Sequence, residues 1–339
     1  MKIGNIDLLR NVLVIAEIGN NHEGDLGLAI EMIHAAASSG AQAVKFQTIQ
    51  PERLVSATQV ARIEQLGRFA FNFEQFAELA EVARAVGVMF LSTPFTPDVV
   101  PWLAHLVPAF KIASGDNNFS QLLEAVAETG KPILLSTGMT DLVGIKQACQ
   151  VIENVYNSSG NGLPVGEIAL LHCVSAYPTP PEQANLRAID TLARETGKLI
   201  GYSDHTLGID AATLSVALGA RIIEKHFTLS KTQSDFRDHA LSADPVELTE
   251  LVRRVRVANI LLGNGEKILQ EGEMSTANAA RRSIVASCAL DTGHLLVDAD
   301  LDWLRPGGGL KPGQESLILG RRLTQSVARG EMIKPDMVA

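Results

Sequence analysis

A chain of 339 residues, 46% hydrophobic and 20% charged, can bury a large core, which excludes a disordered protein and predicts one large domain with a small addition. The net charge of −9 excludes non-specific nucleic-acid binding, because phosphate contacts need a basic surface. The three cysteines are odd in number and lack metal-ligand spacing, which favours a reducing cytoplasm. We expect neither a secretion signal nor a membrane helix, and therefore a cytoplasmic protein.

Short apolar runs alternate with longer segments of helical period, a pattern typical of parallel α/β folds. The runs are 12–18, 43–47, 88–92, 109–113, 132–136, 168–173, 199–202 and 221–225. Segments of helical period such as 26–40 and 72–87 lie between them and end at glycine. Eight such units in about 265 residues predict a (β/α)₈ TIM barrel. A doubly wound sheet is the alternative, but the sequence lacks its usual Gly-rich phosphate loop.

The C-terminal part of the chain differs from the rest in its pattern of apolar, polar and glycine residues. Residues 268–280 are polar without helix-period apolar spacing, which predicts a linker. Residues 281–339 hold short β-like runs, Gly-rich turns and two similar phrases, DTGHLLVDADL and ARGEMIKPDMV. We therefore expect a barrel over 1–267, a linker over 268–280 and a small, mostly β module over 281–339. Such a module has a thin core, so we expect it to dock on another surface.

Polar side chains follow every predicted barrel strand. The chemistry of such barrels lies at the C-terminal ends of the strands, where these side chains would meet. In chain order they are Glu17, Asn20, Lys45, Gln47, Thr93, Lys111, Ser114, Ser136, Thr137, Ser175, Tyr177, Ser203, His205, Glu224 and His226. The sequence therefore predicts a binding site at this end of the barrel.

Two lysines in this set, Lys45 and Lys111, would converge on the barrel mouth. The hydroxyl groups expected beside them are those of Thr93, Ser114, Ser136 and Ser203. Two cations with several hydroxyls suit a small phosphorylated carboxylate. The alternative for each lysine is a structural ion pair, with Glu17 or Asp116 as the partner.

His205 and His226 follow neighbouring strands and could share one metal ion, with Glu17 and Glu224 nearby. Imidazole suits manganese, iron, cobalt or zinc, and two ligands leave positions open for water and substrate. The alternative is a pair of structural histidines, because histidine is commonly semi-buried.

Three further histidines and one acid are candidates. His22 and His239 remain undecided, whereas His172 lies in a buried run and favours a structural role. Asp238 follows the last strand on a loop that must project over the mouth. Its carboxylate could orient a sugar hydroxyl or move a proton, and the alternative is a solvated loop acid.

Phrases along nearly the whole chain resemble those of the bacterial sialic acid (N-acetylneuraminate) synthase family, which includes legionaminate, pseudaminate and spore-coat polysaccharide synthases. They are AEIGNNHEGDL, AVKFQT, FLSTPF, FKIASGDNN, KPILLSTGM, LLHCVSAYPTP, GYSDHTLG, EKHFT, RRSIVAS and LRPGGG. The resemblance implies a (β/α)₈ barrel followed by an antifreeze-like (SAF) domain that reaches across a homodimer.

The same resemblance implies a transferase of sialic acid biosynthesis. It would condense phosphoenolpyruvate with an N-acylated mannosamine-type sugar, release phosphate and form a nine-carbon 2-keto acid. His205 and His226 would bind the divalent metal, usually Mn²⁺, with Mg²⁺ or Co²⁺ as alternatives. Glu17 matches the catalytic acid/base.

Further residues match the family's substrate contacts. Those matching the phosphoenolpyruvate site are Lys45, Thr93, Lys111, Ser114, Ser136 and Ser203. Gln47 and Tyr177 match the sugar side. Arg305 matches an arginine that the partner's tail donates to the sugar N-acyl group.

The chain departs from the family pattern at two places. The usual NIYPTP is SAYPTP here, so Ser175 replaces an asparagine toward the phosphate. The usual GPD is Phe236–Arg237–Asp238, in which Arg237 adds a charge. Both departures leave the condensation intact and the identity of the sugar open.

Two other functions compete with this one. Octulosonate- or heptulosonate-phosphate synthases would need cations for a second phosphate and lack the SAF tail. A non-catalytic sugar-binding protein of polysaccharide assembly would not need Glu17, both lysines and both histidines together.

Overall fold

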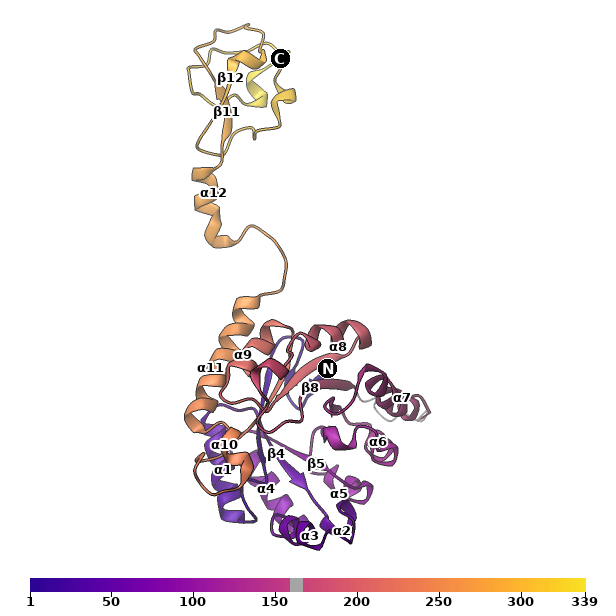
Figure 1. The fold of residues 1–339 in the computed structure, drawn as a ribbon. Helices are drawn as coiled ribbons and strands as arrows, with labels where there is room; N and C mark the ends of the chain where they lie inside the picture. The colour runs from indigo at the N-terminus through magenta and orange to yellow at the C-terminus, as the bar shows by residue number, and fades with distance from the viewer. Residues whose placement is uncertain (159–166) are drawn as a thin grey trace. The chain divides into compact units, whose positions relative to one another are not determined.

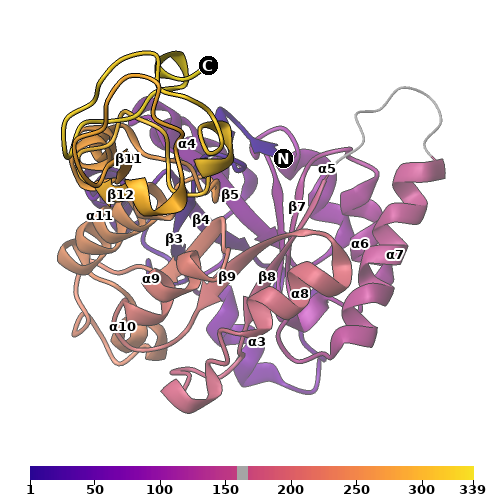
Figure 2. The same ribbon diagram turned by 90° about the horizontal axis from the view of Figure 1, so that it is seen from above.

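The structure, a computed structural model, describes residues 1–158 and 167–339, which form two compact units, Met1–Gly263 and Asn264–Ala339. The first unit contains a parallel eight-stranded sheet of order β5-β4-β3-β10-β9-β8-β7-β6. Its two end strands also lie against each other, so the sheet curves into a nearly closed barrel (Figures 1 and 2). The strands are β3 Leu13–Gly19, β4 Ala43–Thr48, β5 Met89–Pro94, β6 Phe110–Ile112, β7 Ile133–Ser136, β8 Ile168–Cys173, β9 Leu199–Asp204 and β10 Ile222–His226. The structure thus confirms the predicted TIM barrel.

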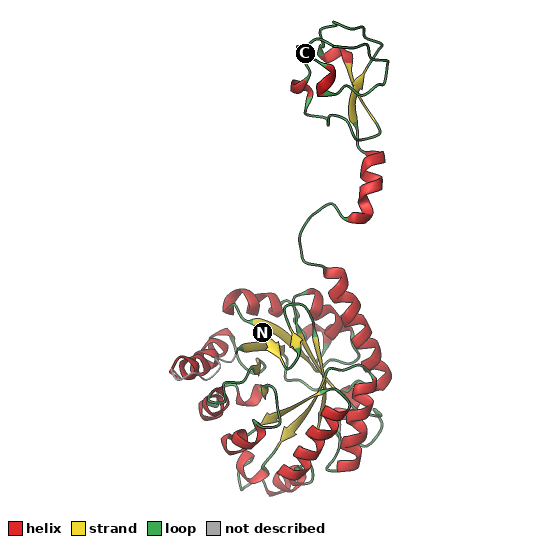
Figure 3. Ribbon diagram, turned by 180° about the vertical axis from the view of Figure 1, so that it is seen from behind, coloured by secondary structure: helices red, strands yellow, loops and turns green. Residues whose placement is uncertain are grey.

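Helices cover the outside of this barrel (Figure 3). They are α1 Leu26–Ser38, α2 Pro51–Leu54, α3 Val60–Gly67, α4 Phe73–Ala85, α5 Val100–Leu103, α6 Ser120–Ala127, α7 Leu142–Ser158, α8 Ala188–Thr196, α9 Asp210–Ala217, α10 Arg237–Leu241 and α11 Pro245–Leu262. Polar caps start several of them. Asp25 accepts from Leu28 N at the start of α1, and Asn72 forms a capping box with Gln75 at the start of α4. None of the described helices is long and apolar enough to cross a membrane.

Alternation along the strands separates two apolar layers. In β3, Val14, Ala16 and Ile18 pack toward the helices, whereas Leu13 and Ile15 fill the barrel interior. The interior layer is closed at the N-terminal end of the barrel by residues of a small hairpin, β1 Lys2–Ile3 and β2 Ile6–Asp7. Because apolar side chains fill that end, the inward polar side chains gather at the opposite, C-terminal end of the strands.

The second unit has its own small core. Strands β11 Ser283–Ala286 and β12 Leu301–Leu304 pair antiparallel, and apolar side chains from 284 to 338 pack around them. The two similar phrases end in matching 3₁₀ turns, Asp298–Asp300 and Pro335–Met337. Helix α12 Met274–Ala280 lies within the segment predicted to be a linker, and none of its residues is buried.

Candidate active site

Two lysines and two glutamates meet inside the C-terminal end of the barrel. Lys45 Nζ lies 2.6 Å from Glu17 Oε2 and 3.8 Å from Glu224 Oε2. Lys111 Nζ lies 3.5 Å from Glu224 Oε1, which also accepts a hydrogen bond from Ser203 Oγ at 2.8 Å. The structure therefore brings together lysines from β4 and β6 with acids from β3 and β10, all buried.

The surroundings push the pKa values of the two acids in opposite directions. Burial raises the pKa of Glu17 above 4.5, and the charge of Lys45 only partly offsets it. Burial also acts on Glu224, but the charges of Lys111 and Lys45 outweigh it and lower the pKa of that carboxyl to about 2. Two acids with separated pKa values can divide the roles of proton carrier and permanent anion. This contrast makes Glu17 the acid suited to proton transfer.

Four hydroxyl groups lie around the lysines and are here called the hydroxyl cradle: those of Thr93, Ser114, Ser136 and Ser175. Thr93 Oγ1 accepts a hydrogen bond from Lys45 Nζ at 3.1 Å. Gly138 N donates to Ser114 Oγ at 3.1 Å, and a β-carbon at Gly138 would lie 2.5 Å from Ser175 Oγ. The hydroxyls of Ser136 and Ser175 are buried without a hydrogen-bond partner. Buried polar groups normally have partners, so these hydroxyls are arranged for a ligand.

His205 and His226 lie side by side, with ring centroids 5.5 Å apart. His205 Nδ1 lies 2.8 Å from the carbonyl oxygen of Val174. A carbonyl oxygen only accepts hydrogen bonds, so Nδ1 carries the proton and Nε2 is left free as a metal ligand. Burial, reinforced by the charges of His205 and Lys45, lowers the pKa of His226 well below 6.5. Its Nδ1 is buried without a hydrogen-bond partner. Two adjacent imidazoles with free nitrogens, of which burial keeps His226 neutral, fit an open divalent-metal site.

Among the described residues, His205 and His226 are not joined by a third protein ligand that would complete a metal site. Within residues 1–158 and 167–339, no group of three or more His, Cys, Asp or Glu side chains is arranged to hold a metal ion. Cys173 is the other soft atom nearby, with Sγ 3.7 Å from His205 Nδ1. That contact reaches the nitrogen already bonded to Val174, so Cys173 orients the ring rather than extending the ligand set.

A cavity of about 1050 Å³ opens above these groups and receives the predicted sugar-side residues. Gln47 lines it and donates to Glu17 Oε1 at 3.1 Å. The ring of Tyr177 lies 4.2 Å from that of His205, and the Arg237 guanidinium lies over the same tyrosine at 4.7 Å. Arg237 Nε also pairs with Asp238 at 2.9 Å, and both line the cavity. Asp238 is therefore a buried, paired acid rather than a solvated loop acid.

The other candidate residues lie elsewhere. His172 bonds the carbonyl oxygen of Ala184, as expected of a structural histidine. His22 stacks on Phe71, and His239 bonds Glu23, so neither joins the histidine pair. Arg305 is exposed in the second unit, in the loop after β12.

One residue, Glu224, had less weight in the sequence than it has in the structure. Glu224 contacts both lysines and Ser203, although the sequence suggested it only as a group near the metal. The alternation of β10 carries the missing signal, because Glu224 and His226 must share a face when Lys225 faces outward. Lys45 does pair with Glu17, as one alternative proposed, whereas Lys111 pairs with Glu224 and not with Asp116.

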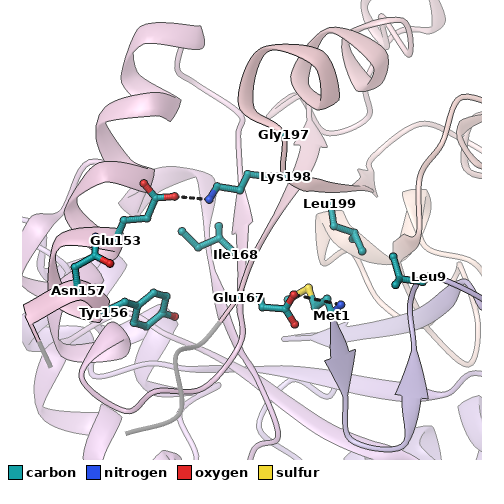
Figure 4. A pocket seen from close by; sticks show the side chains of 10 residues that line it. All are labelled: Met1, Leu9, Glu153, Tyr156, Asn157, Glu167, Ile168, Gly197, Lys198 and Leu199. Atoms are coloured by element: carbon teal, nitrogen blue, oxygen red, sulfur yellow. Dashed lines mark hydrogen bonds and ion pairs between the residues drawn. The ribbon is translucent and has the colours of Figure 1, made fainter. Parts of the chain in front are cut away.

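A second cavity, of about 470 Å³, lies at the other end of the strands (Figure 4). Ile168 and Leu199, the first residues of β8 and β9, line it. Its charged groups are already paired, Met1 N with Glu167 at 3.2 Å and Lys198 with Glu153. This end of such barrels serves stability, so we do not assign the reaction to it.

A buried acid–lysine network beside paired histidines, at the C-terminal end of a (β/α)₈ barrel, defines an enzyme site. The profile of the NeuB family matches residues 32–267, and that of the SAF domain matches 281–339. The chain belongs to the NeuB family and carries a C-terminal SAF domain.

Individual relatives agree with this assignment. An uncharacterised protein of Methanocaldococcus jannaschii is 45% identical, over 95% of this chain and 93% of that protein. The N,N'-diacetyllegionaminic acid synthase of Legionella pneumophila is 39% identical, over 94% of this chain and 92% of the synthase. The N-acetylneuraminic acid synthetase of Leptospira borgpetersenii, solved with citrate, is 36% identical, with a TM-score of 0.75 over 81% of this chain and 94% of that one.

Proposed function

We propose that this protein condenses phosphoenolpyruvate with an N-acylated mannosamine-type sugar, releasing phosphate and forming a nonulosonic acid. The observation that carries the proposal is the meeting of Glu17, Lys45, Lys111 and Glu224 beside the histidine pair. The names of the legionaminate and N-acetylneuraminate synthases among its relatives support the same reaction class.

The lysines and the hydroxyl cradle would bind phosphoenolpyruvate. With both acids ionised, the four charges of the network cancel, so the network alone does not attract a trianion. The raised pKa of Glu17 favours its protonated form. When Glu17 carries a proton, the network has a net positive charge and attracts the anion. The unpartnered hydroxyls of Ser136 and Ser175 would then donate to phosphate oxygens.

In the reaction, C3 of phosphoenolpyruvate attacks the aldehyde carbon of the open-chain sugar and forms the new carbon–carbon bond, while Glu17 gives the proton it carries to the aldehyde oxygen, which becomes a hydroxyl. Positive charge then develops at C2, where the anionic Glu224 stabilises it. Water then adds to C2 as the now ionised Glu17 accepts its proton. The C2 hydroxyl gives its proton to the departing phosphate as the C2–O bond breaks, which leaves the 2-keto group. No covalent bond to the protein forms, so a lysine adduct trapped by borohydride would contradict this scheme.

His205 and His226 would hold a divalent cation, for which we propose Mn²⁺. When bound, this ion supplies polarisation of the sugar aldehyde. The chain's own part is to present two adjacent imidazoles, one of them oriented by Val174. Tyr177, against His205, and the Arg237–Asp238 pair would orient the sugar, and the loop that carries this pair would select among sugars.

We further propose that the enzyme works in the cytoplasm as a homodimer in which Arg305 of one copy completes the sugar site of the other. The exposure of Arg305 in a separate unit and the family resemblance support this arrangement.

The direct test measures phosphate release from phosphoenolpyruvate with a panel of N-acylated hexosamines and diacetamido sugars, with Mn²⁺ or with a chelator. We expect release that requires one sugar of the panel and stops with the chelator. In the variant His226→Ala, metal-dependent turnover should disappear while the fold is retained. Absence of release with every sugar would refute the proposed reaction.

A further inference from the structure

The segment from Ser230 to Leu241, here called the roof loop, ends in α10, carries Asp238 at the cavity and is bonded to the Glu23 carboxylate. Glu23 Oε1 accepts a hydrogen bond from Ser234 Oγ at 2.7 Å. The same oxygen lies 3.0 Å from His239 Nε2, which must donate because an ionised carboxylate can only accept. Ser234 and His239 lie on either side of Asp238 in the chain. One oxygen atom thus fixes both flanks of the acid.

Each partner of this contact is itself fixed. His239 is fully buried, and its Nδ1 lies 2.7 Å from Thr228 Oγ1. Ser234 Oγ accepts from Phe236 N at 3.0 Å, so the bond to Glu23 continues into the loop backbone. Burial would raise the pKa of Glu23, but the bonds from Ser234 and His239 outweigh it and lower that pKa, which keeps the acceptor ionised. Charge-assisted bonds of this kind are stronger than neutral ones.

The backbone of Glu23 is unusual in the same place. Its φ is +48°, in the left-handed region that residues other than glycine seldom adopt. The turn after β3 that holds it is closed by a hydrogen bond from Glu23 N to Asn20 O at 2.9 Å. Such backbone outliers concentrate where the surrounding structure fixes a functional geometry. The turn directs the Glu23 side chain to the roof loop.

A second tether joins the same two segments. Asn21 Nδ2 donates to Ser242 Oγ at 2.9 Å, and Ser242 Oγ donates to the carbonyl oxygen of Asp238 at 2.5 Å. The tether therefore holds the backbone of Asp238 itself. Glu17, four residues before Asn21, belongs to the strand that leads into this turn.

We propose that Glu23 is a positioning residue that fastens the roof loop through Ser234 and His239 and so places Asp238 and Arg237 for the sugar. This inference rests on the proposed function for its catalytic consequence, but the fastening can be measured without substrate. It predicts that loss of the contact weakens sugar binding and leaves phosphoenolpyruvate binding unchanged, because the hydrogen bonds and ion pairs of the lysine network in the described structure involve no residue of the roof loop.

The first experiment is hydrogen–deuterium exchange on the full chain. Glu23→Gln keeps the side-chain shape while removing the charge, and Ser234→Ala removes one donor. Thr232→Ala is the matched control, because Thr232 lies in the same loop and its side chain bonds the hydroxyl of Ser230, within the loop, rather than Glu23. We expect the amides of the roof loop to exchange about tenfold faster in Glu23→Gln and to be unchanged in the control. Unchanged exchange in both Glu23→Gln and Ser234→Ala would overturn the proposal.

The second experiment measures KM for each substrate with the same variants. Glu23→Gln should raise KM for the sugar about tenfold and leave KM for phosphoenolpyruvate within about twofold. The double variant Glu23→Gln/Ser234→Ala should have a KM for the sugar no higher than that of Glu23→Gln, because both substitutions disrupt the same contact. Fully additive effects, or an equal rise for phosphoenolpyruvate, would contradict the positioning role. If the unaltered chain turned over no sugar, the proposed function would fail, and hydrogen exchange would still decide the fastening.

Discussion

Strands β9 and β10 carry two ion networks, one on each face, and the two differ in how completely they are satisfied. On the outer face, Lys225 Nζ lies 2.9 Å from Asp204 Oδ2. Asp204 Oδ1 accepts from Thr206 N, Thr206 Oγ1 and Tyr202 OH. On the inner face, Glu224 lies 3.5 and 3.8 Å from its lysines, and its Oε2 lacks a hydrogen-bond partner.

This difference indicates that the outer network is structural and that the inner network is a binding site. A fully paired buried ion pair fixes a single arrangement of its strands, whereas unpaired buried groups cost free energy unless a ligand completes them. Changes to the inner network should therefore reduce activity, and changes to the outer network should reduce stability.

The largest effect is expected on the inner face. Glu17→Gln should lower kcat by about 10²–10⁴-fold, because the proton acceptor for water is lost. Burial raises the pKa of Glu17, which means that its ionised form does not stabilise the fold. The free energy of unfolding should accordingly change by about 1 kcal/mol or less. Urea unfolding and steady-state kinetics check this. A large loss of stability without a loss of kcat would mean that the inner network is structural rather than catalytic.

The outer face should show the opposite. Lys225→Met leaves Asp204 buried without its cation and should lower the free energy of unfolding by about 3–5 kcal/mol. Adding Asp204→Asn to this variant should recover part of the loss, since the unpaired charge is then gone. Urea unfolding of the single and double variants checks this. A single variant as stable as the unaltered chain would show that the outer pair is not structural.

A pH effect on stability should come from His22, outside both networks. Burial lowers its pKa from 6.5 to about 4. Between these values the unfolded chain binds more protons, so stability is complete above about pH 6.5 and falls toward pH 4, by about 3 kcal/mol for this group. Unfolding of the protein and of His22→Asn across this range should show a shallower slope in the variant. Equal slopes would exclude His22 as the cause.

The smallest change tests the hydroxyl cradle. A β-carbon at Gly138 would lie 2.7 Å from Ser114 Oγ and 2.5 Å from Ser175 Oγ, so Gly138→Ala should displace both hydroxyls. We expect KM for phosphoenolpyruvate to rise about tenfold, the loss of one good hydrogen bond. Gly115→Ala is the control, since its β-carbon would meet only Met139 Cε at 3.9 Å. Equal effects of the two substitutions would refute the cradle.

Much of the fold could be predicted because its signals are local. Runs such as 168–173 coincide with β8, and the alternation of apolar side chains assigned the inner and outer faces. Contacts between distant segments carry no such signal. The sequence offered Glu17 and Asp116 equally as lysine partners, and it left His22 and His239 undecided, because side-chain pairing depends on register and loop path. The bond between Glu23 and His239 joins residues more than two hundred positions apart.

The central claim is that the incomplete inner network binds phosphoenolpyruvate for carbon–carbon bond formation. The most direct measurement uses phosphoenolpyruvate labelled with ¹⁸O in the bridging oxygen and follows the label by mass spectrometry. We predict sugar-dependent release of phosphate that carries the label, with a product whose mass equals sugar plus pyruvate. Unlabelled phosphate would mean cleavage at phosphorus and a phosphoryl transfer, and it would contradict the account.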